Sequence, residues 1–438
     1  MRQSYIFLVL EAMHIAVLGG GVIGITTAWY LRAAGHQVTL IDRQPSVGLE
    51  TSFANGAQLS AGHAEPWAQP GAIKKLIKWL PREDAPLLFR LRLDPAQWRW
   101  GLAFLNACRP SRFEYNLRQI LALGVYSRQQ MMALRAQTGI RFDCLSLGIL
   151  NVYEDRADFA RAEEITALIR SYGYQRAPIT LDEALLKEPG LAHRRSSLVG
   201  ATYTPPDETG DAYLFCCALA KACDQAGVNF ALGQSVEKMV VRAGQVRGLE
   251  IKPIQVDPNI LNSSESQEIA IDACVVAMGS YSARLLQSVG LRIPVYPAKG
   301  YSATMQIIDD AAAPRASVTD EAYKMVFTRL GNRLRIAGTA EFNGYEMELN
   351  PVRCNALIQR AKTLFPGAAE YDHPAFWTGL RPATPSNRPL IGPTQIEGLF
   401  LNTGHGTLGW TEACGSSHAL SLLIDGKQPN VEFDFLHV

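Results

Sequence analysis

The feature that most constrains this chain is a glycine-rich segment near its start, Gly19-x-Gly21-x-x-Gly24, directly after the short apolar run 14–18. That run has the length and composition of a buried parallel strand. Helical apolar spacing follows the glycines, and a second apolar run then ends at Asp42. Strand, glycine turn, helix and strand within about thirty residues is the context that a dinucleotide-binding turn requires. The sequence therefore predicts a Rossmann-type unit.

Each glycine of the motif has a physical role. Gly19 permits the tight turn, Gly21 lets the backbone approach a pyrophosphate, and Gly24 lets the helix pack on the strand. The phosphates then face a helix N-terminus, where free N–H groups and the helix dipole favour anions. Asp42 stands at a strand end, where its carboxylate can accept the ribose hydroxyls and disfavours the 2′-phosphate of NADP. The residues expected at this end of the cofactor are Gly19, Gly21, Val22, Ile23, Gly24, Asp42 and Arg43.

The rest of the chain favours FAD over NAD. An NAD enzyme usually continues with regular βαβ repeats, whereas here the pattern stops after Arg43 and returns only at 228–280. We expect an α/β fold with a glutathione-reductase-like FAD-binding domain and an interleaved α+β substrate domain built on an antiparallel sheet. The predicted division is an extension at 1–12, an FAD-binding domain of 13–70, 208–292 and 376–438, and a substrate domain of 71–207 and 293–375.

Two further segments fit the flavin end of the cofactor. The loop 50–60 is rich in small and polar residues, and its N–H groups can wrap the pyrophosphate and the isoalloxazine edge, although alone it is only a polar loop. The glycine turn 402–410 precedes a helix, so its N–H groups can face the flavin N1/C2=O, which becomes negative on reduction. The expected contacts are Thr51, Ser52, Asn55, Gly56, Gln58, Val236, Gly279, Gly379, His405, Gly406, Thr407 and Leu408.

Arg381, in the segment 378–382, is the candidate for substrate binding. Its planar, permanently charged guanidinium suits a bidentate clamp on a carboxylate. The alternative interpretation is a structural salt bridge.

Composition excludes several classes of protein. Hydrophobic residues make up 47% and charged residues 19% of the 438 residues, which indicates a globular chain with a large core. The formal charge of +1 argues against a nucleic-acid binder. Eight cysteines without any Cys-x-x-Cys argue against a zinc ribbon or a disulfide scaffold, and we expect no metal. No apolar run reaches the ~18–20 residues that span a bilayer.

The polar stretch 253–268 is predicted to be a loop, and 1–12 an upstream extension rather than a short anchor.

Seven segments together resemble a known family: 13–43, 50–71, 205–211, 277–282, 296–302, 376–385 and 401–410. They are similar to the bacterial FAD-dependent D-amino-acid dehydrogenases, of the D-amino-acid oxidase, glycine oxidase and sarcosine oxidase superfamily. The resemblance runs from Met13 to about Asp425. It implies oxidative deamination of D-amino acids to 2-oxo acids and ammonia, with hydride transfer from Cα to flavin N5. It also implies that electrons pass to a respiratory acceptor such as a quinone.

The resemblance implies a site that works mainly by orientation, because the lone pair of the neutral substrate amine drives the hydride out. Arg381 would hold the carboxylate, Tyr301 and Tyr323 would donate hydrogen bonds to it, and Lys299 would support that strand or the flavin. Either tyrosine could instead be an ordinary half-buried sheet aromatic. His63 stands where a tyrosine is expected in close relatives, which leaves its role in a lid and the exact substrate open.

Rival interpretations remain at this stage. The chain could be a glycine oxidase, a sarcosine oxidase, or a D-proline or D-hydroxyproline dehydrogenase of the same superfamily. It could also be a flavin-binding protein without turnover, which the loss of Arg381 would have favoured.

A basic and aromatic stretch predicts a membrane surface. Residues 72–80 place Lys74, Lys75 and Lys78 among apolar side chains, and arginines and tryptophans follow at 90–100. Such a stretch is typical of a peripheral helix on anionic lipid. We therefore expect a location on the cytoplasmic side, peripheral to the bacterial inner membrane. The alternative is an amphipathic helix of the substrate domain with a solvated lysine face.

Overall fold

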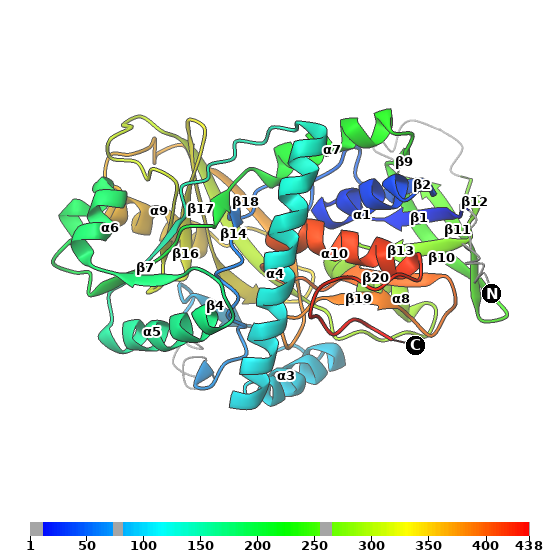
Figure 1. Ribbon diagram of the computed structural model, residues 1–438, viewed down its shortest axis with the longest axis horizontal. Coiled ribbons are helices and arrows are strands. Elements are labelled where there is room, and N and C mark those ends of the chain that lie inside the picture. Colours follow the sequence, from blue (N-terminus) through cyan, green and yellow to red (C-terminus); the bar gives the residue numbers. More distant parts are fainter. Residues whose placement is uncertain (1–11, 73–81, 255–264, 438) are drawn as a thin grey trace, which may run out of the picture.

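The computed structural model describes residues 12–72, 82–254 and 265–437. In these residues the chain forms two main sheets, of six and nine strands, which lie side by side with the long helix α4 (Pro110–Thr138) crossing between them (Figure 1). A three-stranded and a two-stranded sheet complete the described strands.

The six-stranded sheet is the Rossmann-type unit expected from the glycine motif. Its order is β19-β20-β13-β1-β2-β9, and every neighbouring pair is parallel except β19 with β20. The central strand β1 is almost entirely buried, as its uninterrupted apolar sequence predicts. The strands are β1 (His14–Leu18), β2 (Gln37–Asp42), β9 (Asn229–Leu232), β13 (Ala273–Val276), β19 (Leu390–Pro393) and β20 (Leu399–Thr403).

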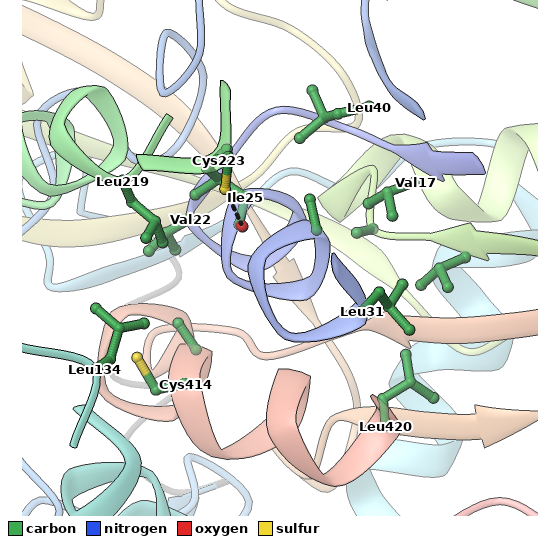
Figure 2. Close-up of a cluster of buried hydrophobic side chains, with 14 of the residues drawn as sticks. Val17, Val22, Ile25, Leu31, Leu40, Leu134, Leu219, Cys223, Cys414 and Leu420 are labelled. Atoms are coloured by element: carbon green, nitrogen blue, oxygen red, sulfur yellow. Dashed lines mark hydrogen bonds between the residues drawn. The ribbon is translucent and has the colours of Figure 1, made fainter. Parts of the chain in front are cut away.

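Helices cover one face of this sheet. Helix α1 (Val22–Ala33) packs between α7 (Ala212–Gln225) and α10 (Gly409–Ile424), and α10 in turn packs against α4. Figure 2 shows the apolar side chains that fill this interface. They include Ile25 and Leu31 of α1, Leu219 of α7 and Leu420 of α10, all fully buried. Burying each such side chain contributes roughly 1.5–3 kcal/mol, so this interface fixes where α1 begins relative to the sheet.

The opposite face of the six-stranded sheet is covered by an antiparallel sheet of β10 (Gln234–Arg242), β11 (Gln245–Pro253) and β12 (Gln267–Ala270). Met239, Leu249 and Ile251 of this sheet pack in one cluster with Ala16 and Leu18 of β1. The loop predicted at 253–268 falls at the connection of β11 and β12, but Pro253 belongs to β11 and residues 267–268 belong to β12. Residues 255–264 fall outside the described residues.

The nine-stranded sheet is mainly antiparallel, in the order β18-β14-β17-β16-β15-β5-β7-β6, with β4 beside β17. Helix α9 (Pro351–Leu364) packs on β14 and β17. Helices α5 (Arg156–Ser171) and α6 (Leu181–Lys187) pack near the end of the sheet that β7 and β6 form (Figure 1). The strands are β4 (Leu87–Phe89), β5 (Ile149–Tyr153), β6 (Ala177–Ile179), β7 (Gly200–Thr204), β14 (Tyr296–Gln306), β15 (Ser317–Asp320), β16 (Met325–Leu330), β17 (Arg333–Phe342) and β18 (Ala375–Ala383).

Strand β18 lies in this larger sheet, although the sequence grouped 376–383 with the FAD-binding part. It pairs with β14 along its whole length, from Tyr296↔Ala383 to Thr304↔Ala375. Hydroxyl groups also connect it to the other part, since the Leu380 carbonyl accepts from Thr51 Oγ1 at 2.9 Å and from Ser280 Oγ at 3.0 Å. The strand therefore belongs to one sheet and is hydrogen-bonded to both parts of the chain.

Helix α3 (Pro95–Ala107) lies at one edge of the molecule (Figure 1). Asp94 caps its N-terminus by accepting from the Ala96 N–H at 2.9 Å. Trp100 and Phe104 are buried on its inner side, and Trp98, Leu102 and Leu105 are exposed on its outer side. None of the helices in 12–72, 82–254 and 265–437 has the length and apolar character needed to cross a bilayer.

Candidate active site

A cavity of about 530 Å³ lies between the two main sheets. One side is formed where strands of the six-stranded sheet end, with Leu18, Asp42 and Thr403 in its lining, and the other by a face of the nine-stranded sheet. A crevice at the carboxyl ends of parallel strands is the usual ligand site of open α/β sheets.

The turn before α1 forms one end of the cavity. Gly19 has a φ of 106°, and a Cβ there would lie 2.6 Å from the Ala277 carbonyl oxygen. Gly24 lies against the same turn, because its Cβ would fall 1.7 Å from the Gly19 oxygen. No side chain caps α1 at Gly21, its first turn carries no acidic residue, and the Val22 N–H donates to Ser52 Oγ at 3.0 Å. The result is a helix N-terminus that lines the cavity and suits a pyrophosphate.

Asp42 lies beside this turn with both oxygens engaged. Its Oδ2 accepts from the Gly20 N–H, and its Oδ1 accepts from the Gln44 N–H at 2.6 Å. Burial raises the pKa of Asp42, while these two N–H groups oppose that rise. Each oxygen keeps a further acceptor position toward the cavity, which fits a ribose diol.

Arg43 is held beside the ribose position by two contacts. Its Nη2 lies 2.6 Å from Glu50 Oε1, and its guanidinium lies over the Tyr281 ring, 3.9 Å from the centroid. Glu50 and Tyr281 also line the cavity, and the sequence did not single them out. Glu50 stands at the start of a polar loop, and that position was the only available signal for it.

The glycine turn before α10 forms another wall of the cavity. Gly404 and Gly406 adopt left-handed φ values of 83° and 54°, and no side chain caps α10. His405 between them is buried, with no partner for either ring nitrogen among the described residues. Burial lowers its pKa to about 3, so the ring is neutral. Buried polar atoms in a native fold normally have partners, so these nitrogens fit a site completed by a ligand.

The cofactor residues predicted from sequence converge on this cavity. Except for Gly24, which packs behind the turn, all of them are in its lining. The cavity thus has two uncapped helix N-termini, of α1 and α10, and a carboxylate between the strands. That arrangement fits FAD, whose pyrophosphate and reduced flavin ring both carry negative charge.

Arg381 lies in the cavity over the backbone of β14. A Cβ on Gly300 would lie 2.2 Å from the Arg381 Cζ, so a side chain at position 300 would displace the guanidinium. Its Nη1 donates to the Thr339 carbonyl at 2.9 Å, and no carboxylate in the described part of the chain pairs with it. Burial lowers the pKa of Arg381 to about 10, and the nearby Arg353 adds to this. The alternative of a structural salt bridge therefore does not hold, and the side chain is suited to bind an anion.

Thr339 occupies an irregularity of β17. The pairing with β14 shifts there, since Gly300 pairs with Ala340 and Tyr301 with Gly338. Thr339 is the extra residue, and its φ is 54°, a conformation that is rare for a β-branched residue. The bulge frees its carbonyl from the ladder, and that carbonyl accepts from Arg381.

Tyr301 and Lys299 meet at Glu341. The Tyr301 hydroxyl donates to Glu341 Oε2 at 2.5 Å, and Lys299 Nζ lies 3.3 Å from the same oxygen. Burial alone would raise the pKa of Glu341, but the Tyr301 hydrogen bond and the Lys299 charge lower it. The Tyr301 ring lines the cavity, yet its proton goes to Glu341 and not to a substrate. Lys299 is buried outside the lining and supports this strand.

Tyr323 does not join the site. It is 39% exposed, lies outside the cavity lining, and stacks with the Arg360 guanidinium at 4.1 Å. The prediction that it donates to the substrate carboxylate is therefore not met by this structure. It lies in the turn between β15 and β16, and sequence alone does not say which way such a turn faces.

His63 does line the cavity. Its Nδ1 lies 3.8 Å from Glu65 Oε2, and Glu321 and Lys324 line the cavity nearby. The ion pair of Glu321 with Lys324 was not predicted, because the two residues follow a strand end with no distinctive spacing.

The backbone connects the substrate and flavin walls directly. The Gly406 N–H donates to the Pro382 carbonyl at 2.9 Å, and an isolated bridge pairs Ala383 with His405. The strand that carries Arg381 is therefore hydrogen-bonded to the glycine turn before α10.

Comparison with known proteins places the chain among flavoenzymes. The DAO family, described as FAD dependent oxidoreductase, matches residues 14–423. D-amino acid dehydrogenase of Dechloromonas aromatica is 51% identical over 424 residues, covering 97% of this chain and 100% of the relative. The protein of the same name from Paramagnetospirillum magneticum is 44% identical over 427 residues, covering 97% and 98%. The glycine oxidase structure from Geobacillus kaustophilus is similar in fold, with a TM-score of 0.72, 22% identity, and coverage of 96% of this chain and 97% of that one.

Proposed function

Because this chain belongs to the DAO family of FAD-dependent oxidoreductases, we propose that it oxidises D-amino acids to 2-oxo acids and ammonia. Relatives that cover nearly the whole chain are named D-amino acid dehydrogenase. One observation carries the proposal: a half-buried guanidinium, Arg381, faces the cavity without a carboxylate partner in the described residues. A carboxylate ligand satisfies that group, and every amino acid has one.

We propose that the six-stranded part holds FAD and that the nine-stranded sheet orients the substrate. The N-terminus of α1 would hold the pyrophosphate, Asp42 the ribose, and the turn at 404–409 the flavin ring, since all of them line the cavity. Bound FAD supplies a two-electron acceptor for the hydride that leaves the substrate Cα.

The protein's own groups then orient the substrate. Arg381 holds the carboxylate, and the Thr339 carbonyl fixes the guanidinium. Glu341 accepts from Tyr301 and pairs with Lys299, which fixes the positions of both side chains on β14. Holding two reactants in the correct geometry is a large part of catalysis when no side-chain base is required.

The test is an anaerobic titration of the purified yellow protein with matched D- and L-amino acids. Bleaching of the flavin by D-amino acids, with ammonia and a 2-oxo acid as products, is the expected result. Bleaching only by glycine, sarcosine or D-proline would assign a different amine oxidation, and no bleaching by any amine would overturn the proposal.

We also infer that the electrons pass to a quinone at a membrane surface. The relatives are named dehydrogenases, a name that points to an acceptor other than oxygen. Support also comes from exposed apolar side chains on α3 and on the segment just before it. This set, here named the α3 outer face, consists of Leu91, Leu93, Trp98, Leu102 and Leu105. Their exposed fractions run from 45% for Leu105 to 103% for Leu93. Apolar side chains exposed together mark an interaction surface.

Charge supports a lipid partner for this face. Arg99, Arg109 and Arg112 are exposed beside it. Cations flanking exposed aromatic and aliphatic side chains suit the interface of an anionic membrane. The predicted lysine-rich segment 72–80 precedes this region, but 73–80 lies outside the described residues. Trp100, which the sequence grouped with the surface aromatics, is buried on the inner side of α3.

A further inference from the structure

Part of the cavity lining lies against α3. This part, here named the α3 arm, is Trp67, Gln69, Ala72, Pro86, Leu87 and Phe104, of which Phe104 belongs to α3 itself. The arm begins next to the substrate position, because Ala340, which follows Thr339, pairs with Leu87 and donates its N–H to the Pro86 carbonyl at 2.8 Å.

The α3 arm is apolar. Among its described lining residues only Gln69 has a polar side chain. Trp67, Ala72, Leu87 and Phe104 pack in one cluster around Phe342, with the Trp67 and Phe342 rings in edge contact at 6.4 Å. Such a wall binds a ring with an apolar tail better than a second charged group.

The arm is separated from the α3 outer face by a single helix. Phe104 lies on the inner side of α3 with 6% exposed, whereas Trp98 and Leu102 on the outer side are 52% and 68% exposed. Phe104 on the inner side of α3 thus lines the cavity, and the apolar side chains on its outer side are exposed. A water-soluble amino acid needs no apolar surface beside its entry, whereas a ligand that arrives from a membrane does.

We propose that the α3 arm binds the head of a lipid-soluble quinone, which is the electron acceptor. This inference rests on the proposed function and adds to it the place where the second substrate binds. The quinone enters after the 2-oxo acid has left. It gains the two electrons and two protons that the amino acid lost, and it leaves as the quinol.

A second occupant, the side chain of the amino acid itself, is the competing possibility. It predicts that filling the arm changes which D-amino acids bleach the flavin. The quinone predicts instead that filling the arm spares that reaction and slows reoxidation.

The experiment uses the FAD-loaded protein and Leu87→Trp, which fills the arm from a half-buried position on β4. Leu186→Trp, on exposed α6, is the matched control. Both proteins are reduced anaerobically, once with D-amino acids and once with dithionite. They are then mixed either with a quinone bearing a ten-carbon tail or with a small charged dye.

We expect bleaching by D-amino acids to stay within about twofold of the unmodified protein, and reoxidation by the tailed quinone to slow at least about tenfold, equal to 1.4 kcal/mol. Reoxidation by the dye should not change. The oxidised protein should gain thermal stability with the tailed quinone, and Leu87→Trp should lose that gain. Flavin content and Tm check the fold, and Leu87→Gln replaces Leu87→Trp if the latter does not fold.

Equal reoxidation of Leu87→Trp and Leu186→Trp by the tailed quinone would overturn the proposal. A changed order of preference among small and large D-amino acids, with quinone reoxidation intact, would assign the arm to the side chain. Because dithionite reduces the flavin without an amino acid, the quinone step is tested even if no D-amino acid bleaches the protein, which would contradict only the proposed function.

Discussion

Arg381 and Thr339 form a contact in which each explains the geometry of the other. The guanidinium donates from Nη1 to the Thr339 carbonyl at 2.9 Å, and Thr339 holds a φ of 54° in the middle of β17. A regular strand would direct that carbonyl into the ladder with β14. The bulge turns it toward the cavity, at a cost of order 1–3 kcal/mol for the unfavourable backbone.

Replacing Thr339 by glycine tests this relationship. Glycine adopts a positive φ without strain, so we expect Thr339→Gly to raise the free energy of unfolding by up to about 1 kcal/mol. The looser backbone should hold Arg381 less firmly, so the KM for the D-amino acid should rise several-fold. Ala337→Gly on the same strand is the control and should lower stability, because its φ is not positive. A loss of stability in both variants would show that Thr339 is not strained.

Arg381→Lys keeps the charge but removes the planar fork. We expect the substrate to bind off-axis, with kcat/KM lowered at least about tenfold, since position and orientation both suffer. Flavin content should match the unmodified protein, because Arg381 contacts none of the turns assigned to FAD. Steady-state kinetics with D-alanine and the absorbance of bound flavin check both points. Turnover like that of the unmodified protein would show that Arg381 does not hold the carboxylate.

Asp42→Ala should weaken FAD. The change removes acceptors for the ribose and leaves the Gly20 and Gln44 N–H groups without their partner. Hydrogen bonds to a charged group are worth about 1.5–3 kcal/mol each, so we expect an affinity loss of roughly tenfold to hundredfold. Fluorescence titration of the apoprotein with FAD measures it. Unchanged affinity would place the ribose elsewhere, with Glu50 as the next candidate.

His405 predicts a pH-dependent stability. Its pKa is about 3 in the folded chain against 6.5 ordinarily, so below pH 6.5 the unfolded chain takes up a proton that the folded chain refuses. The stabilising contribution is present above pH 6.5 and is lost progressively as the pH falls toward 3. Between pH 7 and 5 this amounts to about 2 kcal/mol.

The measurement is urea unfolding of the FAD-loaded protein at pH 7 and 5. His405→Gln should lose less stability over this interval than the unmodified protein. His373→Gln, at an exposed position, should lose as much stability as the unmodified protein. Identical pH dependence in all three proteins would mean that His405 is not buried as a neutral ring.

The α3 outer face predicts salt-sensitive membrane binding. We expect the protein to float with anionic liposomes at low salt and to float less at high salt, because arginines flank the apolar side chains. Trp98→Glu with Leu102→Glu should abolish flotation, and Leu186→Glu on exposed α6 should not. Protein that stays at the bottom of the gradient at low salt would contradict this use of α3.

The parts of the site that sequence predicted are those built by local spacing. The turn at Gly19 to Gly24 and the turn at Gly404 to Gly406 are each defined by residues a few positions apart, so their conformations follow from the glycines. Asp42 follows at a strand end, where the βαβ unit fixes its place.

The parts that sequence missed depend on pairing between distant strands. Glu341 meets Tyr301 across β14 and β17, and the bulge at Thr339 arises only in that pairing. Tyr323 was grouped with Tyr301 because both are tyrosines and either hydroxyl can donate a hydrogen bond to a carboxylate. Its direction is set by the turn and by Arg360, which lies 37 positions later in the sequence.

The hydrogen bond from the Gly406 N–H to the Pro382 carbonyl fixes the distance between two walls of the cavity. Two sheets joined by long connections can rotate relative to each other. Such a rotation would ordinarily change the distance between residues on one sheet and residues on the other. Here the strand with Arg381 and the turn before α10 are fastened at adjacent backbone positions, next to the place where the reaction occurs. A motion of one sheet against the other would therefore leave the spacing between Arg381 and the turn before α10 nearly unchanged.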